Sequence, residues 1–146
     1  MKSEEASAAL DAVASANRSV AAATTAPLWR HAAFALVMAL LMLSVAAGKP
    51  FWVLPWALSM IGMALLYWWD RRQTGMFVNG YRRGRTLPLT IALLVVSLAL
   101  VVTAGRLNLY GHHELALLTV PAAFVVALVT SLWWERIFLR ELGATR

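Results

Sequence analysis

The chain has 146 residues, of which 61% are hydrophobic and 14% charged, and it contains no cysteine. Soluble domains carry about 45–50% apolar and about 25% charged residues, so this composition excludes an ordinary water-soluble domain and indicates an integral membrane protein. The net charge of +6 would suggest nucleic-acid binding in a soluble protein. We expect no nucleic-acid partner here, because the basic residues lie outside the apolar segments and suit contacts with anionic lipid headgroups.

The alanine-rich segment at the N-terminus predicts a short cytoplasmic helix and a linker over residues 1–28. Ser3 is a candidate N-cap, and Glu4 and Glu5 suit the positive end of a helix dipole. The apolar stripe around Leu10 is too weak to predict an amphipathic helix that binds the membrane surface. We interpret the segment as a solvated helix, with docking on a basic loop or pairing between protomers as the alternatives.

Four windows without any charged residue follow, and each is long enough to cross a membrane. About 20 helical residues span the hydrocarbon core, and a helix satisfies its own backbone groups without water. The sequence therefore predicts an all-α membrane protein with a four-helix transmembrane domain over residues 29–136 and a cytoplasmic tail over 137–146. The predicted spans are residues 32–48, 51–69, 87–105 and 115–134. Within the second span, Gly62 is expected to let a neighbouring helix approach closely.

The distribution of Lys and Arg predicts the orientation of these spans. With the N-terminus inside, eleven of the 13 basic residues face the cytoplasm, and only Lys49 and Arg106 face the other side. Basic residues concentrate on the cytoplasmic side of membrane proteins. We therefore expect a bacterial inner (plasma) membrane protein with both termini in the cytoplasm. The outer turns are then short, and the second runs over residues 106–114.

Tryptophan is placed at the ends of the predicted spans. Amphipathic rings favour the headgroup level of the bilayer, so we interpret these residues as interfacial anchors rather than as a stacking platform for bases or sugars. The predicted anchors are Trp29, Trp52, Trp56, Trp68, Trp69, Trp133 and Trp134.

A four-residue pattern, Trp-Trp-acid-Arg, closes both the second and the fourth span, at residues 68–71 and 133–136. It is consistent with two tandem helical hairpins derived by duplication of one unit. The alternative is convergence, because aromatic and charged residues are typical of any cytoplasmic span end. We interpret Asp70 and Glu135 as members of interfacial ion pairs with the arginine that follows each of them.

The cytoplasmic loop over residues 70–85 is the most informative soluble stretch. Its Asn79-Gly80 dipeptide is a strong turn signal, because both residues tolerate positive φ. We expect a small hairpin or hooked turn there. Its arginines are candidates for contact with anionic lipid or with a partner, and the alternative is that they serve topology alone. These candidates are Arg71, Arg72, Arg82, Arg83 and Arg85.

Residues 74–85 read Thr-Gly-x-x-x-x-Gly-Tyr-Arg-x-Gly-Arg. With the N-terminal helix and the four spans, this loop resembles small uncharacterised bacterial integral membrane proteins. The resemblance covers most of the chain. It implies the membrane topology, and it implies no activity, substrate or catalytic residue.

Residues that carry chemistry are scarce. The four windows hold no carboxylate, histidine or arginine, which proton-coupled transporters place at membrane depth. The His112-His113-Glu114 cluster is interpreted as a polar turn rather than a metal site, because no second cluster supplies further ligands. We therefore predict no catalytic, cofactor-binding or metal-binding residues.

The function favoured by these patterns is that of a non-enzymatic interaction, regulatory or scaffold protein. Its expected partners are the lipid bilayer with its anionic headgroups, and either a second copy in a homo-oligomer or another membrane protein. The alternative is a small transporter or channel subunit whose pathway forms between protomers. A polar, water-filled cavity at mid-membrane would favour transport, and a dry bundle would favour a scaffold.

Overall fold

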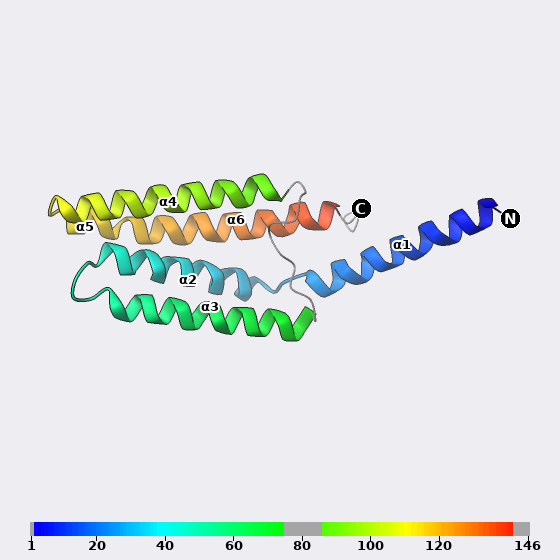
Figure 1. The fold of residues 1–146 in the computed structure, drawn as a ribbon, viewed down its shortest axis with the longest axis horizontal. Helices are drawn as coiled ribbons and strands as arrows, with labels where there is room; N and C mark the ends of the chain where they lie inside the picture. The colour runs from blue at the N-terminus through cyan, green and yellow to red at the C-terminus, as the bar shows by residue number, and fades with distance from the viewer. Residues whose placement is uncertain (1, 75–85, 142–146) are drawn as a thin grey trace.

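The computed structural model describes residues 2–74 and 86–141, and within these ranges the chain forms helices joined by turns. Figure 1 shows α2, α3, α4 and α6 lying side by side and α1 extending away from them. The helices are α1 Lys2–Thr24, α2 Leu28–Ala46, α3 Val53–Thr74, α4 Leu87–Leu109, α5 His113–Leu117 and α6 Thr119–Glu141.

The four helices α2, α3, α4 and α6 form an antiparallel bundle. The pairs that pack extensively in the described ranges are α2 with α6, α2 with α3, and α4 with α6. The helices therefore follow one another in the order α3, α2, α6, α4, as Figure 1 shows, and α2 lies between α3 and α6. We call the end where α2 begins and α3 and α6 end the polar end, and the opposite end the turn end.

The two helical hairpins of the sequence hypothesis are present as α2 with α3 and α4 with α6. A duplicated unit related by an axis along the membrane normal would pack α4 on α3 as closely as it packs α2 on α6. In the part of the chain that the structure describes, α3 and α4 are not an extensively packed pair. The packing is therefore not that of two hairpins related by such an axis.

Small residues fill the interior of the bundle. Most of the buried hydrophobic residues are alanines, among them Ala35 and Ala39 of α2, Ala104 of α4 and Ala127 of α6. Small side chains let helix backbones approach closely, which favours helix association in lipid. Gly62 of α3 shows the same effect, since a Cβ built on it would lie 2.7 Å from Cγ2 of Val37. The predicted close approach at Gly62 is confirmed.

The turn between α2 and α3 is fixed by its backbone and by a neighbouring side chain. Ala47 N–H donates to Leu43 O at 2.8 Å, and Gly48 follows with φ +63°, the left-handed conformation in which glycine commonly ends a helix. Asn108 of α4 donates from Nδ2 to the carbonyl oxygens of Val45, at 2.7 Å, and Ala46, at 3.0 Å. This amide thus satisfies carbonyls that α2 leaves without a helical partner.

By length and composition, three helical stretches could cross a membrane: Leu28–Ala46, Leu87–Leu109 and His113–Glu141. The third stretch joins α5 to α6. The remaining helix of the bundle, α3, contains the Tyr-Trp-Trp-Asp-Arg-Arg sequence within its last turns, and these residues lower its hydropathy. Large apolar side chains are exposed along α3 and α4, including Ile61 and Leu65 of α3 and Leu94 and Leu98 of α4. Such outer faces suit a lipid surrounding.

Several helices extend further than the sequence analysis predicted. The α3 helix continues to Thr74 through the start of the predicted loop, and α6 continues to Glu141 through the start of the predicted tail. The predicted outer turn over residues 106–114 shortens to residues 110–112 between α4 and α5. The physical reason is that Arg is a good helix former and suits the last turn of a helix, so an absence of charge does not define helix ends.

Candidate functional site

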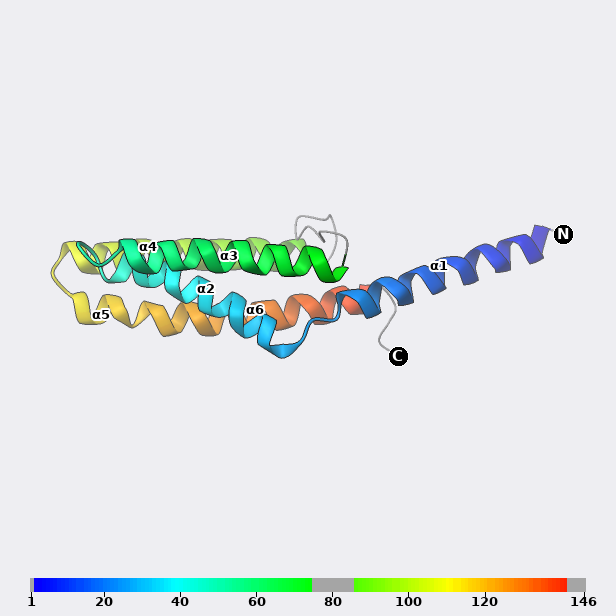
Figure 2. The same cartoon turned by 90° about the horizontal axis from the view of Figure 1, so that it is seen from below.

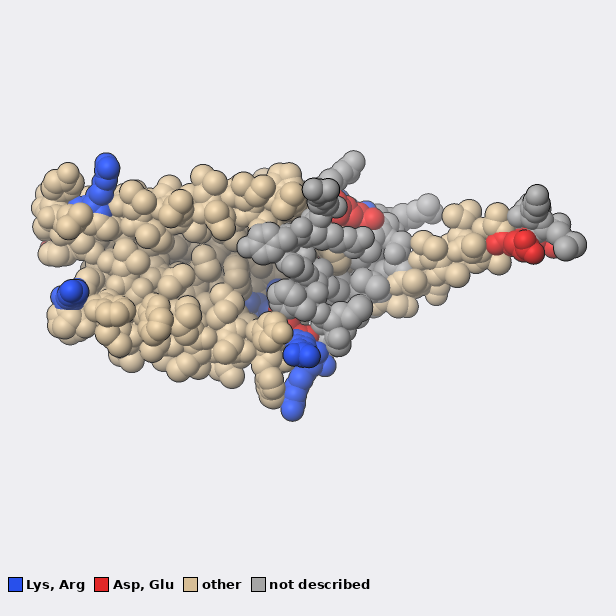
Figure 3. Space-filling model, in the orientation of Figure 1, with Lys and Arg blue, Asp and Glu red and all other residues tan. Residues whose placement is uncertain are grey.

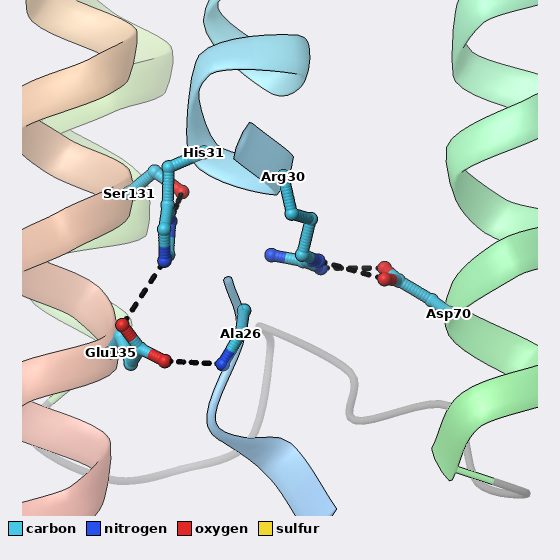
Figure 4. A network of polar contacts seen from close by, with 6 residues as sticks. All are labelled: Ala26, Arg30, His31, Asp70, Ser131 and Glu135. Carbon is cyan, nitrogen blue, oxygen red and sulfur yellow. Dashed lines mark hydrogen bonds and ion pairs between the residues drawn. The ribbon is translucent and has the colours of Figure 1, made fainter. Parts of the chain in front are cut away.

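Polar side chains from α2, α3 and α6 meet at the polar end of the bundle. Figure 4 shows them as two groups on opposite sides of the first turn of α2. One group is the pair Arg30 and Asp70, and the other is the cluster of His31, Ser131 and Glu135 with the backbone of Ala26. We call these six residues the polar network.

Arg30 of α2 forms a two-pronged ion pair with Asp70 of α3. Arg30 Nε donates to Oδ1 at 2.7 Å, and Nη2 donates to Oδ2 at 2.5 Å. Both side chains are partly exposed. Two parallel hydrogen bonds between a guanidinium and a carboxylate fix orientation as well as distance, so this pair sets the register between α2 and α3.

His31 is enclosed between α2 and α6, with 2% of its surface exposed. Its Nδ1 lies 2.8 Å from Oγ of Ser131, and its Nε2 lies 3.0 Å from Oε2 of Glu135. An ionised carboxylate only accepts hydrogen bonds, so Nε2 carries the proton and donates to Glu135. In the neutral ring, Nδ1 then accepts from the Ser131 hydroxyl. Both ring nitrogens are thus satisfied by α6.

The second oxygen of Glu135 holds the segment that leads into α2. Ala26 N–H donates to Oε1 of Glu135 at 2.6 Å. Ala26 lies between the end of α1 at Thr24 and the start of α2 at Leu28. Glu135 therefore connects α6 both to α2, through His31, and to the linker from which α1 extends.

The two acids occupy the same place in the Trp-Trp-acid-Arg pattern, and they bind consecutive residues of α2. Neighbouring residues on a helix point about 100° apart, so Arg30 faces α3 while His31 faces α6. Both acids therefore make their contacts between helices, Asp70 as an ion pair and Glu135 as a hydrogen-bond acceptor. This corrects the expectation that Asp70 and Glu135 would pair with the arginine that follows each of them, because adjacent side chains on one helix do not face each other.

The contacts of Ser131, His31 and Glu135 are those of a serine–histidine–acid set, in which a base activates a hydroxyl. Catalysis also requires an accessible nucleophile and donors for the oxyanion. Here His31 is almost fully buried, and neither Ser131 nor Glu135 lines the hollow between α2 and α3 or the hollow between α4 and α6. Among the described residues, every buried side-chain nitrogen or oxygen has a hydrogen-bond partner. The three side chains thus link α2 to α6, with both ring nitrogens of His31 in contact with residues of α6.

The predicted tryptophan anchors gather at the two ends of the bundle. At the polar end, Trp29 of α2 packs edge-on against Trp69 of α3 with ring centroids 4.7 Å apart. Arg72 lies 4.0 Å above the ring of Trp68. Trp133 and Trp134 lie near the end of α6, where Trp134 stacks on Phe138. Trp52 and Trp56 contact each other at the turn end. Their role as interfacial anchors stays a prediction.

The predicted basic contact residues are only partly described. Arg71 and Arg72 are exposed in the last turn of α3, at the polar end. Arg82, Arg83 and Arg85 lie outside the described residues, as does the predicted Asn79-Gly80 turn. Figure 3 shows blue Lys and Arg side chains toward the two ends of the bundle, with a tan surface between them.

The histidine cluster lies in the turn between α4 and α5 and at the start of α5. His112 precedes α5, and His113 Nδ1 lies 2.8 Å from Oδ1 of Asn108. In the described ranges no group of three or more His, Cys, Asp or Glu residues is placed to hold a metal ion. Asn108 therefore joins His113 to the end of α2.

Sequence analysis missed Arg30, His31 and Asn108 as positioning residues. Arg30 and His31 lie just before the first uncharged window, where the sequence pattern indicates a topology determinant for Arg30 and no role for His31. One signal could have found them: two acids at equivalent span ends require partners at the same depth. No comparable signal marks Asn108, because its partners are backbone carbonyls.

No family model, no curated protein and no solved structure matches this chain significantly. The resemblance to small bacterial membrane proteins therefore stays a prediction.

Proposed function

We propose that the chain is a non-enzymatic integral membrane protein whose bundle holds α1 as an interaction arm at one membrane face. The observation that carries this proposal is the position of α1. Its 23 residues extend away from the bundle, as Figure 2 shows, and the side chains of residues 4–16 are all exposed. The hydrogen bond from Ala26 to Glu135 ties the base of this arm to α6.

In this proposal the bundle crosses the membrane four times, with α3 as the fourth span. Support comes from its length of 22 residues and from its packing along α2. A helix of that length is about 33 Å long, enough for a hydrocarbon core of about 30 Å. Four spans place both termini on one side, and the basic residues favour the cytoplasm of a bacterial cell, with the inner membrane as location.

The interior of the bundle favours a scaffold over a transporter. The buried hydrophobic residues are mostly alanines, and two hollows in the described structure, between α2 and α3 and between α4 and α6, are lined mainly by apolar side chains. Ser44, Ser59 and Thr119 donate their hydroxyl protons to carbonyls of their own helical segments. A pathway for ions or polar substrates needs polar groups directed into a cavity at mid-membrane. In the described interior, these three hydroxyl groups instead bind carbonyl oxygens of their own helical segments.

The face of α1 most suited to a partner carries Leu10 and Val13, which are 71% and 58% exposed. Residues three apart share one face of a helix, so these side chains form a small apolar patch on the arm. Burial of two such side chains in a helix–helix contact contributes about 1.5–3 kcal/mol each. We propose a second helical segment, from another membrane protein or a second copy, as the partner.

Site-specific photocrosslinking in living cells tests this proposal. A photoreactive residue at position 10 or 13 should give a defined crosslinked product, and the same residue at Ala8, on the opposite exposed face, should give far less. When the photoreactive residue is placed on the partner, deletion of residues 2–24 from this chain should abolish the crosslinked product. Membrane insertion of the shortened chain should stay intact. Equal crosslinking from both faces, or none from either, would show that α1 is a solvated helix without a partner.

A further inference from the structure

A half-open hollow of about 560 Å³ lies between α2 and α3 near the polar end. Its wall is almost entirely apolar, and the Arg30–Asp70 ion pair also lines it. The apolar lining consists of Phe34, Met60, Met63, Ala64, Leu66 and Tyr67. Methionine side chains adapt to irregular shapes, so this wall suits a flexible hydrocarbon chain.

We propose that this hollow is a binding site for a membrane phospholipid with a phosphoethanolamine headgroup. One acyl chain lies in the hollow between α2 and α3, the phosphate binds Arg30, and the ammonium binds Asp70. The proposal rests on the membrane location of the bundle and is independent of any partner of α1.

The length of the hollow fits one leaflet of a bilayer. Its lining on α3 runs from Met60 to Asp70, which is ten residues or about 15 Å along the helix axis. The hydrocarbon core is about 30 Å thick, so this distance matches the depth that one acyl chain reaches from the headgroup level. The ion pair is at the end of the lining where the headgroup would be.

The ion pair also fits the two charges of the headgroup. Arginine has five N–H donors, and the bonds to Asp70 occupy Nε and one donor of Nη2. In Figure 4 the remaining terminal nitrogen of Arg30 points away from Asp70, to the side of Ala26 and Glu135, and in this proposal its N–H groups donate to a phosphate oxygen. The pair is neutral as a whole, which favours a zwitterion over an anion. A primary ammonium donates charge-assisted hydrogen bonds to a carboxylate, and a trimethylammonium has no N–H to donate.

The second hairpin supplies a matched control. A hollow of about 360 Å³ lies between α4 and α6, lined by Leu93, Val96 and Val129 among other side chains. Thr130 and Trp133 are its only residues with polar side-chain atoms among the described residues, and none of its lining residues is charged. It can hold a hydrocarbon chain, but it lacks groups to select a headgroup.

Native mass spectrometry of the full chain tests the site. The protein is transferred into detergent with equal amounts of phosphatidylethanolamine, phosphatidylcholine and phosphatidylglycerol of identical acyl chains. We expect the phosphatidylethanolamine adduct to exceed each of the others by about tenfold, the scale of one charge-assisted hydrogen bond. Ala64→Phe, which fills the α2–α3 hollow, should remove this excess, while Ala92→Phe in the α4–α6 hollow should leave it unchanged.

Asp70→Asn tests the headgroup contact without filling the hollow. Its amide no longer attracts the ammonium and no longer neutralises Arg30, so the preference should shift from phosphatidylethanolamine to phosphatidylglycerol. This variant decides the question even if Ala64→Phe fails to fold. Equal retention of phosphatidylethanolamine and phosphatidylcholine by the unaltered protein would overturn the proposal, as would equal losses from Ala64→Phe and Ala92→Phe. A preference for phosphatidylglycerol in the unaltered protein would also overturn it.

Discussion

Nε2 of His31 lies 3.0 Å from Oε2 of Glu135, and this contact joins residues that are 104 positions apart in the chain. It lies where the first turn of α2 meets the last turns of α6. The neighbouring Arg30–Asp70 pair joins α2 to α3 at the same end of the bundle. The α2 helix is thus held between two acids, Asp70 of α3 and Glu135 of α6.

His31→Ala should lower the free energy of unfolding by about 1–3 kcal/mol, because it removes the ring nitrogens that contact Oγ of Ser131 and Oε2 of Glu135. In a double-mutant cycle, His31→Ala and Glu135→Ala should couple by about 0.5–3 kcal/mol. The cycle of His31→Ala with Asp70→Ala is the control, and its coupling should stay below about 0.5 kcal/mol. Reversible unfolding in mixed micelles measures the three single variants and the two double variants. Coupling of equal size in the two cycles would contradict the separation of the network into two groups.

Gly62→Ala should destabilise the bundle by about 1–3 kcal/mol, because the added methyl group overpacks the contact of α3 with α2. The reason is the 2.7 Å distance from a built Cβ to Cγ2 of Val37. Gly105→Ala in α4 is the matched control, since a Cβ there meets no atom within 4 Å. That variant should be neutral or more stable by up to about 1 kcal/mol, from helix propensity alone. The unfolding midpoint should therefore fall for Gly62→Ala, and it should stay the same or rise for Gly105→Ala.

Asn108→Asp should destabilise the turn end more than Asn108→Ala does. Both variants lose the donor to the carbonyls of Val45 and Ala46, at a cost of about 1–3 kcal/mol for unsatisfied buried groups. The aspartate adds a negative charge beside the negative end of the α2 dipole. Thermal unfolding of the purified variants ranks them, and an aspartate variant as stable as the unaltered protein would refute this role of Asn108.

Reporters fused to each terminus should both report the cytoplasm, because the basic residues favour that side. The chain contains no cysteine, so single cysteines give unambiguous labelling. Tyr110→Cys, at a residue 75% exposed between α4 and α5, should react with an impermeant thiol reagent added to intact cells. Arg71→Cys at the polar end should react only after permeabilisation. Reaction of both from outside would refute the proposed threading.

The sequence by itself determined that this is a helical protein of membrane-like composition, and it located the long helices. Apolar length and charge placement are local properties, so they can be read directly from the chain. Gly62 as a point of close approach also followed from the sequence, because a glycine among small residues in an apolar helix has few other uses.

Tertiary structure alone decided which helices pack together and which charges meet. The order α3, α2, α6, α4 places Arg30 and His31 opposite Asp70 and Glu135. A linear sequence shows the depth of each of these residues but not the direction of its side chain. That direction depends on the rotation of α2 about its axis, which packing of its alanine-rich face against α6 fixes. The polar network is therefore a consequence of helix packing that no local pattern encodes.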